Sequence, residues 1–327
     1  MKPDSTMQTE ENPVLPPVDR VDRVDSLDRL GIVGYGEVGR IFAAGLRKAG
    51  VSDVAVWDLK FIDPAKGPEP LAHAQVAGAV AADSVAALCA GRQLIVSAVT
   101  ASNTLAVAEA VALHIAPGAF FLDLNSASPG TKQQAAALIH ARGARYVEAG
   151  VMTSVPPYGI AVPMLLGGPH AATLAPVLHR WGMDAKPVSD QLGVASAIKM
   201  CRSVMIKGLE ALVMESYATA RHYGVEDHVL PTLAETFPSI DWQKQGSYFF
   251  SRVVQHGQRR AEEMRESART VGEAGMAPLM ASAIADKQQW VADLAREGIF
   301  QGLPHDARWQ DYADRLLESL SSPAAGG

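Results

Sequence analysis

The chain has 327 residues, of which 48% are hydrophobic and 20% are charged, and its formal net charge is −6. This length and apolar content suit one large domain or two domains with substantial cores. The acidic balance argues against nucleic-acid binding as the main function, and no apolar run approaches the roughly 20 residues that span a membrane. The N-terminus lacks a signal-peptide core, so we expect a cytoplasmic protein that binds neither nucleic acid nor membranes.

Cysteine and histidine usage gives no sign of a metal site. The two cysteines, Cys89 and Cys201, lie in apolar surroundings. A disulfide between them is possible on paper, but two buried thiols in a reducing compartment fit better. The nine histidines are scattered, and no pair has metal-ligand spacing with a third ligand nearby.

Residues 1–28 are polar, contain several prolines and include a short Val-Asp-Arg repeat. Nothing in this segment can build a core, so we expect a disordered tail. Beyond it, a short apolar run ends at a glycine cluster and is followed by an apolar run with helical spacing. This pattern predicts a strand, a tight turn and a helix.

The turn carries Gly34, Gly36 and Gly39 in the G-x-G-x-x-G spacing. Glycines so placed permit the turn, let the backbone approach a pyrophosphate, and let helix and strand pack closely. The free N–H groups of the first helical turn then face the phosphates. A second apolar run ends at Asp58, roughly 20 residues on, where a dinucleotide fold places an acid for the ribose hydroxyls. The combination predicts a dinucleotide site rather than a turn that only packs a helix on a strand.

Further apolar runs predict strands near 94–99, 119–124 and 145–149, with helices at 105–114 and 132–141 between them. Repeated units of this length indicate an α/β fold with a doubly wound, Rossmann-type parallel sheet. Ligands of such sheets bind at the carboxyl ends of the strands. The loops that follow the strands should therefore meet at one edge.

After Gly193 the pattern becomes helical. The predicted helices are 194–223, 226–237, 241–255, 258–271, 277–297 and 306–320. We therefore expect four parts: a tail at 1–28, a dinucleotide-binding Rossmann domain at 29–190, an all-helical domain at 191–320 that begins with a long interdomain helix, and a frayed end at 321–327. The helical domain has more apolar faces than a small sheet domain can cover, which favours a homo-oligomer, either a dimer or a tetramer.

Four motifs follow the order seen in β-hydroxyacid dehydrogenases: the glycine turn, DLNSASP at 123–129, EAGVMTS at 148–154 and GVASAIK at 193–199. From about residue 30 to 215 the chain resembles this superfamily, which includes 3-hydroxyisobutyrate and 6-phosphogluconate dehydrogenases. Lys207-Gly208 and residues 259–264 look like a poorly characterised bacterial subgroup of it. The resemblance implies an NAD(P)-dependent oxidoreductase that acts on a small, acidic substrate, namely a hydroxy acid and most simply a 3-hydroxy acid.

By this resemblance Lys199 matches the catalytic lysine, the general acid/base, whose pKa would fall near a largely apolar site. The segment 150–154 matches the motif that holds the substrate carboxylate, although Met152 replaces the usual serine. Two family asparagines are also replaced, by Arg202 and Ser203, and Lys207 two turns beyond Lys199 is a fallback base or a substrate contact. The implied substrate-binding residues are Gly150, Val151, Met152, Thr153, Ser154, Arg202, Ser203 and Lys207.

The implied cofactor is a nicotinamide dinucleotide. Asp58 accepts ribose hydroxyls and would repel a 2′-phosphate, which favours NAD over NADP, although Lys60 and Lys66 nearby weaken this preference. The implied cofactor contacts are Gly34, Tyr35, Gly36, Glu37, Val38, Gly39, Asp58, Val99, Thr100, Asn103, Asn125 and Ser126.

Two other functions stay open from the sequence. An imine or ketone reductase on the same scaffold is one, but such relatives usually lack the lysine that Lys199 supplies. A catalytically silent dinucleotide-binding module is the other, because the substrate motif is degenerate. The charged residues Arg259, Arg260, Glu262 and Glu263 are most simply a solvated, ion-paired helix face.

Overall fold

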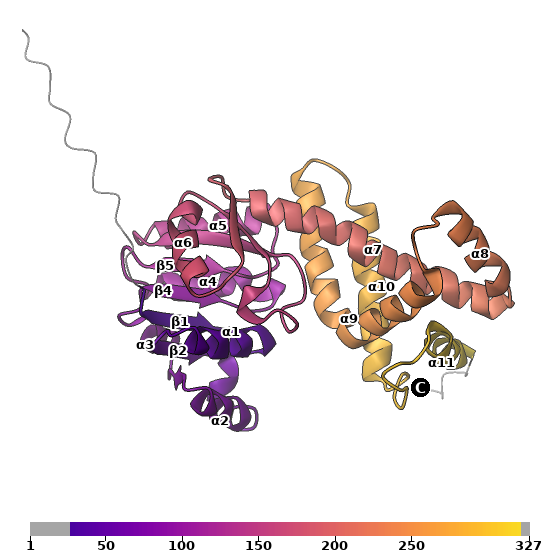
Figure 1. The fold of residues 1–327 in the computed structure, drawn as a ribbon, viewed down its shortest axis with the longest axis horizontal. Coiled ribbons are helices and arrows are strands. Elements are labelled where there is room, and N and C mark those ends of the chain that lie inside the picture. The colour runs from indigo at the N-terminus through magenta and orange to yellow at the C-terminus, as the bar shows by residue number, and fades with distance from the viewer. Residues whose placement is uncertain (1–26, 322–327) are drawn as a thin grey trace, which may run out of the picture.

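The computed structural model describes residues 27–321. Most of the tail predicted at 1–28, and all but the first residue of the end predicted to fray, lie outside the described residues. Figure 1 shows two halves of the molecule. The sheet half, at the left, contains the sheet and the helices that cover it, and the helical half, at the right, contains helices only. One long helix, α7 (Val194–Tyr223), runs from the sheet half into the helical half.

Eight strands form one sheet in the order β3-β2-β1-β4-β5-β6-β7-β8. The strands are β1 (Arg29–Val33), β2 (Asp53–Trp57), β3 (Val80–Ala81), β4 (Leu94–Ser97), β5 (Phe120–Asp123), β6 (Arg145–Val151), β7 (Met164–Gly167) and β8 (Ala185–Ser189). All neighbouring pairs are parallel except β6 and β7. The predicted Rossmann-type sheet is confirmed, with one antiparallel pairing that the sequence pattern did not indicate.

Helices cover both faces of this sheet, and each face has its own apolar core. Side chains of α1 (Glu37–Lys48), α2 (Pro68–Val76) and α6 (Ala171–Arg180) pack on one face. Side chains of α3 (Val85–Cys89), α4 (Thr104–Ala112) and α5 (Pro129–His140) pack on the other. Strands β4 and β5 are buried along their whole length, as the unbroken apolar runs predicted. Three short 3-10 helices lie in the connecting loops: η1 (Leu59–Ile62), η2 (Ala101–Asn103) and η3 (Gly159–Ala161).

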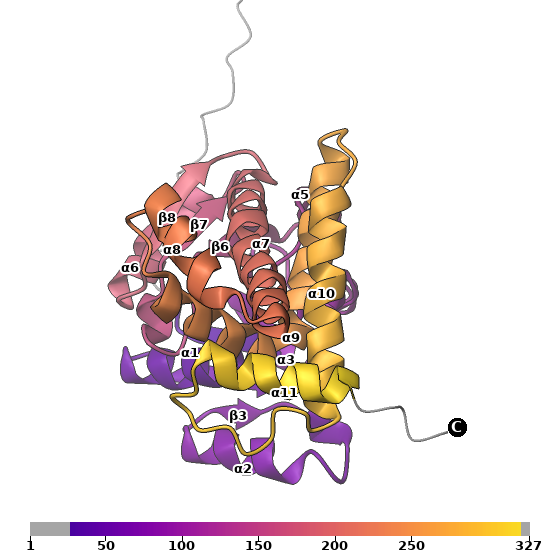
Figure 2. The ribbon, with the colours of Figure 1, turned by 90° about the vertical axis from the view of Figure 1, so that its right-hand side faces the viewer.

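The helical half contains α7, α8 (Glu226–Thr236), α9 (Trp242–Glu273), α10 (Leu279–Arg296) and α11 (Trp309–Ser321). Figure 2 shows α11 lying across the bundle that α7, α9 and α10 form. The predicted break between two helices at 255–258 is wrong, because α9 is continuous there. A β-carbon at Gly257 would lie 2.8 Å from the carbonyl oxygen of Gln288, so this glycine serves close packing against α10.

The two cysteines are free thiols. Cys89 is buried, as expected, and burial raises its pKa to about 11. Cys201 is exposed, and the expectation that both thiols are buried is wrong for it. Its apolar neighbours in the sequence belong to other faces of α7.

Candidate active site

The glycine turn joins β1 to α1 at the carboxyl edge of the sheet. Gly34 has a φ of +92°, and a β-carbon there would lie 2.4 Å from the carbonyl oxygen of Ala98. A β-carbon at Gly39 would lie 1.9 Å from the carbonyl oxygen of Gly34, so both positions require glycine. At Gly36 a β-carbon would meet no described atom within 4 Å, and α1 begins there without a side-chain cap. Open space in front of an uncapped helix N-terminus fits a pyrophosphate.

Asp58 directly follows β2, and its carboxylate hydrogen-bonds to the backbone of the glycine turn. Its Oδ2 accepts a hydrogen bond of 2.7 Å from the backbone N–H of Tyr35, and its Oδ1 accepts one from the backbone two residues on. The carboxylate has further lone pairs for ribose hydroxyls. The Tyr35 side chain is buried, and its hydroxyl lies 3.0 Å from Nδ1 of His73. Only the backbone of Tyr35 is therefore available to contact a ligand. Glu37 and Val38 belong to the first turn of α1.

The loops after β4 and β5 carry the other predicted cofactor contacts. Oδ1 of Asn125 accepts a 2.7 Å hydrogen bond from the N–H of Val99, and its Nδ2 donates to Ser97 at 2.9 Å. Nδ2 of Asn103 donates to the Thr100 hydroxyl at 2.8 Å. These bonds fix two adjacent strand ends to each other, so the structure brings these residues to the same edge as the glycine turn.

A buried network that the sequence did not indicate supports the loop after β5. Oδ1 of Asp123 lies 2.9 Å from Nζ of Lys132, and Oδ2 accepts a 2.6 Å hydrogen bond from the Tyr146 hydroxyl. The N–H of Asn125 donates to the same carboxylate. Burial and the neighbouring Asp123 charge raise the pKa of Tyr146, which therefore stays a donor. Because the buried charges are paired and hydrogen-bonded, they hold this loop in one conformation.

Lys199 lies in the second turn of α7, and its Nζ donates a 2.6 Å hydrogen bond to Oγ of Ser126. Burial lowers the pKa of Lys199 from 10.5 to about 7. The Glu263 carboxylate opposes this shift, and nearby cations reinforce it. An amine with a pKa near neutrality can take up or release a proton at physiological pH.

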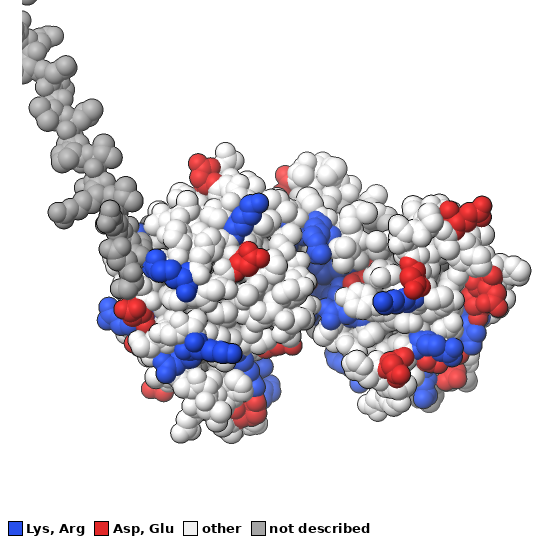
Figure 3. All heavy atoms as spheres, viewed as in Figure 1, with Lys and Arg blue, Asp and Glu red and all other residues white. Residues whose placement is uncertain are grey.

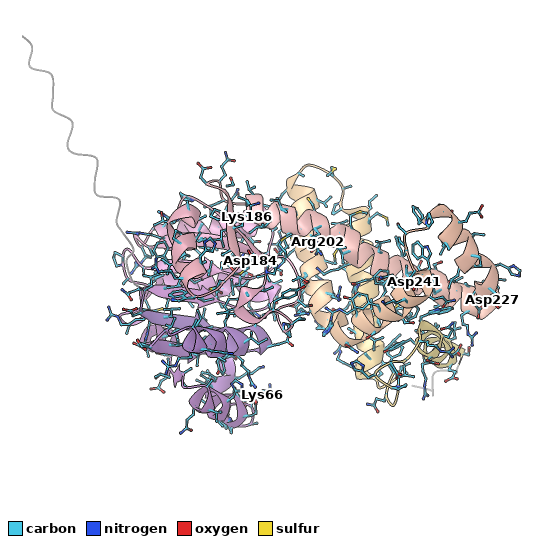
Figure 4. All side chains as sticks on the ribbon, in the orientation of Figure 1. Lys66, Asp184, Lys186, Arg202, Asp227 and Asp241 are labelled. Carbon is cyan, nitrogen blue, oxygen red and sulfur yellow. The ribbon has the colours of Figure 1, made fainter. Side chains whose placement is uncertain are left out.

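Lys207 and Ser203 lie further along α7, beside Lys199. Nζ of Lys207 lies 2.7 Å from a carboxylate oxygen of Glu263 and donates to Oγ of Ser203 at 3.1 Å. Burial raises the pKa of Glu263, but the charges of Lys207 and Lys199 outweigh it and bring that pKa down to about 2. Arg202 is exposed on α7 at the boundary between the two halves, where Figure 4 labels it.

Helix α9 contributes to this site, which sequence reasoning missed. The face at 259–263 was predicted to be solvated and ion-paired. The ion pairs are present, since Arg260 pairs with Glu210 of α7 and Glu263 pairs with Lys207, but Arg260 is buried rather than solvated and Glu263 is only partly exposed. Glu262 accepts a hydrogen bond from Ser102 in η2. Lysine and arginine side chains gather at the junction of the two halves in Figure 3. In the sequence, the only sign that this face of α9 belongs to the site is the repeat of charged residues at helical spacing.

The segment predicted to hold the substrate begins where β6 passes α7. A β-carbon at Gly150 would lie 2.9 Å from the carbonyl oxygen of Ala195 and 3.6 Å from the β-carbon of Lys199. Glycine at 150 therefore lets the strand approach the helix that carries the lysine. Val151 ends β6 and pairs with Met164 of β7.

The rest of this segment leaves the sheet. The N–H of Met152 donates to the carbonyl oxygen of Pro163 at 2.9 Å, so it is engaged within the protein. Thr153 is exposed, and Oγ of Ser154 accepts a 3.2 Å hydrogen bond from Arg252 of α9. This part of the segment therefore carries two side-chain hydroxyls, one of which contacts an arginine of α9.

Residues 27–321 contain neither a metal-ligand cluster nor a membrane-spanning helix. Within that range no group of three or more histidine, cysteine, aspartate or glutamate residues is placed to hold a metal ion. Over the same residues, none of the helices combines the length and the apolar character that crossing a membrane requires.

Family models match a large part of each half of the chain. Residues 29–189 match the family model for the NAD binding domain of 6-phosphogluconate dehydrogenase, and residues 220–291 match a domain of unknown function, DUF1932.

Solved structures extend the comparison to nearly the whole chain. A conserved hypothetical protein from Sinorhizobium meliloti is 35% identical, with 91% of this chain and 99% of that chain covered and a TM-score of 0.71. A conserved protein of unknown function, described as structurally similar to 3-hydroxyacid dehydrogenases, is 29% identical over 82% of this chain and 98% of its own, with a TM-score of 0.64. A 3-hydroxyisobutyrate dehydrogenase from Mycobacterium tuberculosis, 16% identical, shares the fold over 89% of this chain and 99% of its own, with a TM-score of 0.64. From its nucleotide-binding domain and its relatives, this chain belongs to the β-hydroxyacid dehydrogenase superfamily.

Proposed function

We propose that the protein is an NAD(P)-dependent oxidoreductase that transfers a hydride between nicotinamide and a small hydroxy acid, most simply a 3-hydroxy acid. The observation that carries this proposal is the environment of Lys199. Its Nζ lies 2.6 Å from Ser126 at the carboxyl edge of the sheet, and its pKa is about 7. A lysine tuned to neutrality beside a dinucleotide turn suits proton transfer coupled to hydride transfer.

The glycine turn and the N-terminus of α1 would hold the pyrophosphate, and Asp58 would hold the ribose hydroxyls. The negative charge of Asp58 repels a 2′-phosphate, so NAD is favoured over NADP. When bound, the cofactor supplies the hydride acceptor or donor. Asn125 and the loop after β4 would orient its nicotinamide side.

Lys199 moves the proton. In the oxidation direction the neutral amine takes the hydroxyl proton, and in the reduction direction the ammonium group donates a proton to the carbonyl oxygen. With a pKa of about 7, both forms are populated at neutral pH. Ser126 orients the amine through its hydrogen bond. Lys207 is paired with Glu263 and offers a fixed positive charge beside the reacting centre.

The test is an oxidation assay on a panel of small hydroxy acids with NAD or NADP, followed by absorbance of the reduced cofactor. Lys199→Ala should lower kcat by about 10²- to 10⁴-fold and leave the dissociation constant of the cofactor unchanged. The matched control is Lys186→Ala, because Lys186 is an exposed lysine on β8, away from the junction of the two halves (Figure 4). It should behave as wild type.

Other outcomes would redirect the assignment. Turnover that survives in Lys199→Ala would move proton transfer to Lys207 or water. Turnover of imines or simple ketones, with none of hydroxy acids, would favour the reductase alternative. Cofactor binding without turnover of any compound would favour a silent dinucleotide-binding module.

A further inference from the structure

Three cations lie around the carboxyl end of β2, and each of them faces an acid of the protein. Lys66, labelled in Figure 4, lies 3.6 Å from the Asp63 carboxylate. Lys60 interacts electrostatically with the carboxylate of Glu69, and Arg40 pairs with the same carboxylate. This end of the strand is where the ribose of a dinucleotide would bind, so its charges bear on which dinucleotide fits.

Arg40 and Glu69 form a two-point ion pair between α1 and α2. Nη1 of Arg40 donates to Oε1 of Glu69 at 2.6 Å, and Nη2 donates to Oε2 at 2.5 Å. The Glu69 side chain is 71% exposed, whereas that of Arg40 is only 25% exposed. Because an ion pair with so exposed a partner adds little stability, removal of the Glu69 charge should leave the fold intact.

Arg40 and Asp58 contact opposite ends of one residue, Tyr35. Oδ2 of Asp58 accepts a hydrogen bond of 2.7 Å from the Tyr35 N–H, and Nε of Arg40 donates to the Tyr35 carbonyl oxygen at 3.4 Å. The guanidinium carbon lies 5.8 Å from the centroid of the Tyr35 ring. That ring is buried and meets Phe61 and His73 edge to face, which fixes it in place. Arg40 is therefore held next to the acid that would bind the ribose.

NADP differs from NAD by a phosphate on the 2′-oxygen of this ribose. A guanidinium group suits a phosphate because it presents parallel N–H donors, and in dinucleotide folds an arginine near the ribose accommodates the 2′-phosphate. Arg40 has the charge and the position for this role, but Glu69 engages both of its terminal nitrogens. A 2′-phosphate would have to displace the Glu69 carboxylate or lie beside two carboxylates.

The two lysines of this region are weaker candidates for a phosphate contact. The Lys66 side chain is 71% exposed and lies beside Asp63, and Lys60 is also exposed. Holding a flexible, exposed lysine in one conformation costs side-chain entropy, and its ammonium group offers no fork of donors. Arg40 is already ordered by its contacts with Tyr35, so less entropy would be lost if it bound the phosphate.

We propose that Glu69 is a determinant of cofactor choice, because it holds Arg40 in an ion pair and withholds its guanidinium group from a 2′-phosphate. This inference rests on the proposed function, since it requires a dinucleotide with its ribose at Asp58. Two acids then disfavour NADP in different ways. Asp58 repels the phosphate directly, and Glu69 neutralises the cation beside it.

The test measures the binding of two dinucleotide fragments that lack nicotinamide, so it requires no turnover. The fragments are ADP-ribose and the same compound with a phosphate on the 2′-oxygen of its adenosine, each titrated into the full chain by calorimetry. The variants are Glu69→Gln, Arg40→Gln and the double variant, with Glu69→Gln measured in the Asp58→Asn background as well. Glu109→Gln, at an exposed glutamate of α4, is the matched control.

Wild type, Arg40→Gln and Glu109→Gln should bind ADP-ribose more tightly than its 2′-phosphate. Glu69→Gln should shift the ratio of the two dissociation constants about tenfold toward the phosphorylated compound, because the released guanidinium forms charge-assisted hydrogen bonds with the phosphate. Its affinity for ADP-ribose should equal that of wild type. The same shift should occur in the Asp58→Asn background and disappear in the double variant, which lacks the guanidinium group.

Three results would overturn the proposal. One is a ratio that Glu69→Gln leaves unchanged. Another is an equal shift in the double variant, since this would reveal direct repulsion by Glu69 rather than release of Arg40. The third is a wild type that binds the phosphorylated compound more tightly.

This inference and the proposed function fail separately. Turnover of hydroxy acids with NAD, together with an unchanged ratio in Glu69→Gln, would leave the dehydrogenase function standing and remove the role of Glu69. A ratio that depends on Glu69 and Arg40, without turnover of any hydroxy acid, would remove the dehydrogenase function and keep the role of Glu69 in a dinucleotide-binding protein.

Discussion

At the scale of single residues, the proton-transfer group owes its pKa to two opposing effects. Burial removes water from the Lys199 ammonium group and lowers its pKa to about 7, while the Glu263 carboxylate raises it. The balance leaves Lys199 usable in both directions of the reaction. Glu263 is thus a positioning residue that acts on catalysis through Lys199 and Lys207.

Glu263→Gln should shift the pH profile of hydroxy acid oxidation. Oxidation needs the neutral amine, so kcat/KM in wild type should rise with pH through an apparent pKa near 7. Loss of the carboxylate removes the effect that raises the Lys199 pKa, so the rise should move about one to two units toward lower pH. The measurement is kcat/KM against pH, with Glu235→Gln, at an exposed glutamate of α8, as the control. A profile identical to wild type would contradict the assigned role of Glu263.

Asp58→Asn should change the choice of cofactor. The asparagine keeps one oxygen acceptor for the backbone of the glycine turn but loses the charge that repels a 2′-phosphate. The ratio of kcat/KM for NAD to that for NADP should fall at least about tenfold, because hydrogen bonds to a charged group are lost. Steady-state kinetics with both cofactors checks this, with Asp227→Asn, at an exposed aspartate of α8, as the control. A wild-type enzyme that prefers NADP would refute the assignment.

Local motifs predicted the residues whose chemistry depends on their immediate neighbours in the chain. The glycine turn and Asp58 belong to this group, because short spacings specify a turn and a strand end. Lys199 was predicted from the resemblance of the segment 193–199 to a dehydrogenase motif. Glu263 and Arg252 could not be found in that way. Arg252 contacts a serine 98 positions away, and the contact exists only because α9 lies against the sheet half.

At the scale of elements, the long helices show where sequence patterns are sufficient and where they fail. The bounds of α7 follow from an unbroken helical pattern between Gly193 and Gly224, both of which adopt positive φ. The false break in α9 arose because Gly257 resembles a terminator when read locally. Its actual role, close contact with α10, depends on a helix that follows later in the chain.

Glu148 fixes the start of α7 to the sheet. From β6, its fully buried carboxylate accepts hydrogen bonds from the N–H groups of Gly193 and Ala195 and from the Ser196 hydroxyl, at 2.9 to 3.0 Å. A carboxylate is favoured there by the free N–H groups and by the helix dipole. Because Lys199 lies one turn further on, Glu148 also sets the position of the proton-transfer group.

Glu148→Gln should destabilise the protein and weaken catalysis. The amide NH₂ group cannot accept the hydrogen bonds of the helix N-terminus, so the free energy of unfolding should fall by about 2 kcal/mol. Urea denaturation followed by circular dichroism measures this change. Glu109→Gln, at an exposed glutamate on α4, is the control and should leave the midpoint unchanged. A stable Glu148→Gln variant would show that the cap does not hold α7.

At the scale of the whole molecule, the two halves are joined at more than one point. Besides α7, the C-terminal part of α9 meets the N-terminus of α5 through two carboxylates. Glu266 accepts from the N–H of Ser128 at 2.8 Å, and Glu273 accepts from the Ser128 hydroxyl at 2.7 Å and the N–H of Gly130 at 3.0 Å. The proposed site lies between these contacts and the Arg252 end of α9, so both halves supply its residues.

The helical half also presents an apolar line that nothing in the described chain covers. Ile198, Met205 and Leu212 follow one another at seven-residue spacing along α7, and all three are exposed. Side chains at this spacing lie along one line of a helix and are typical of a seam with another helix. We infer that a second copy of the chain covers this line and that the protein is a homo-oligomer.

Met205→Glu combined with Leu212→Glu should therefore convert a wild-type dimer or tetramer into a monomer. These side chains are 66% and 53% exposed in the single chain. Burying one such side chain contributes about 1.5 to 3 kcal/mol, and in a two-fold symmetric interface each contribution occurs twice. Light scattering coupled to size exclusion measures the mass. Leu113→Glu, at a 68% exposed leucine of the sheet half, is the matched control and should keep the wild-type mass. A monomeric wild type, or a double variant that remains assembled, would show that α7 does not form this seam.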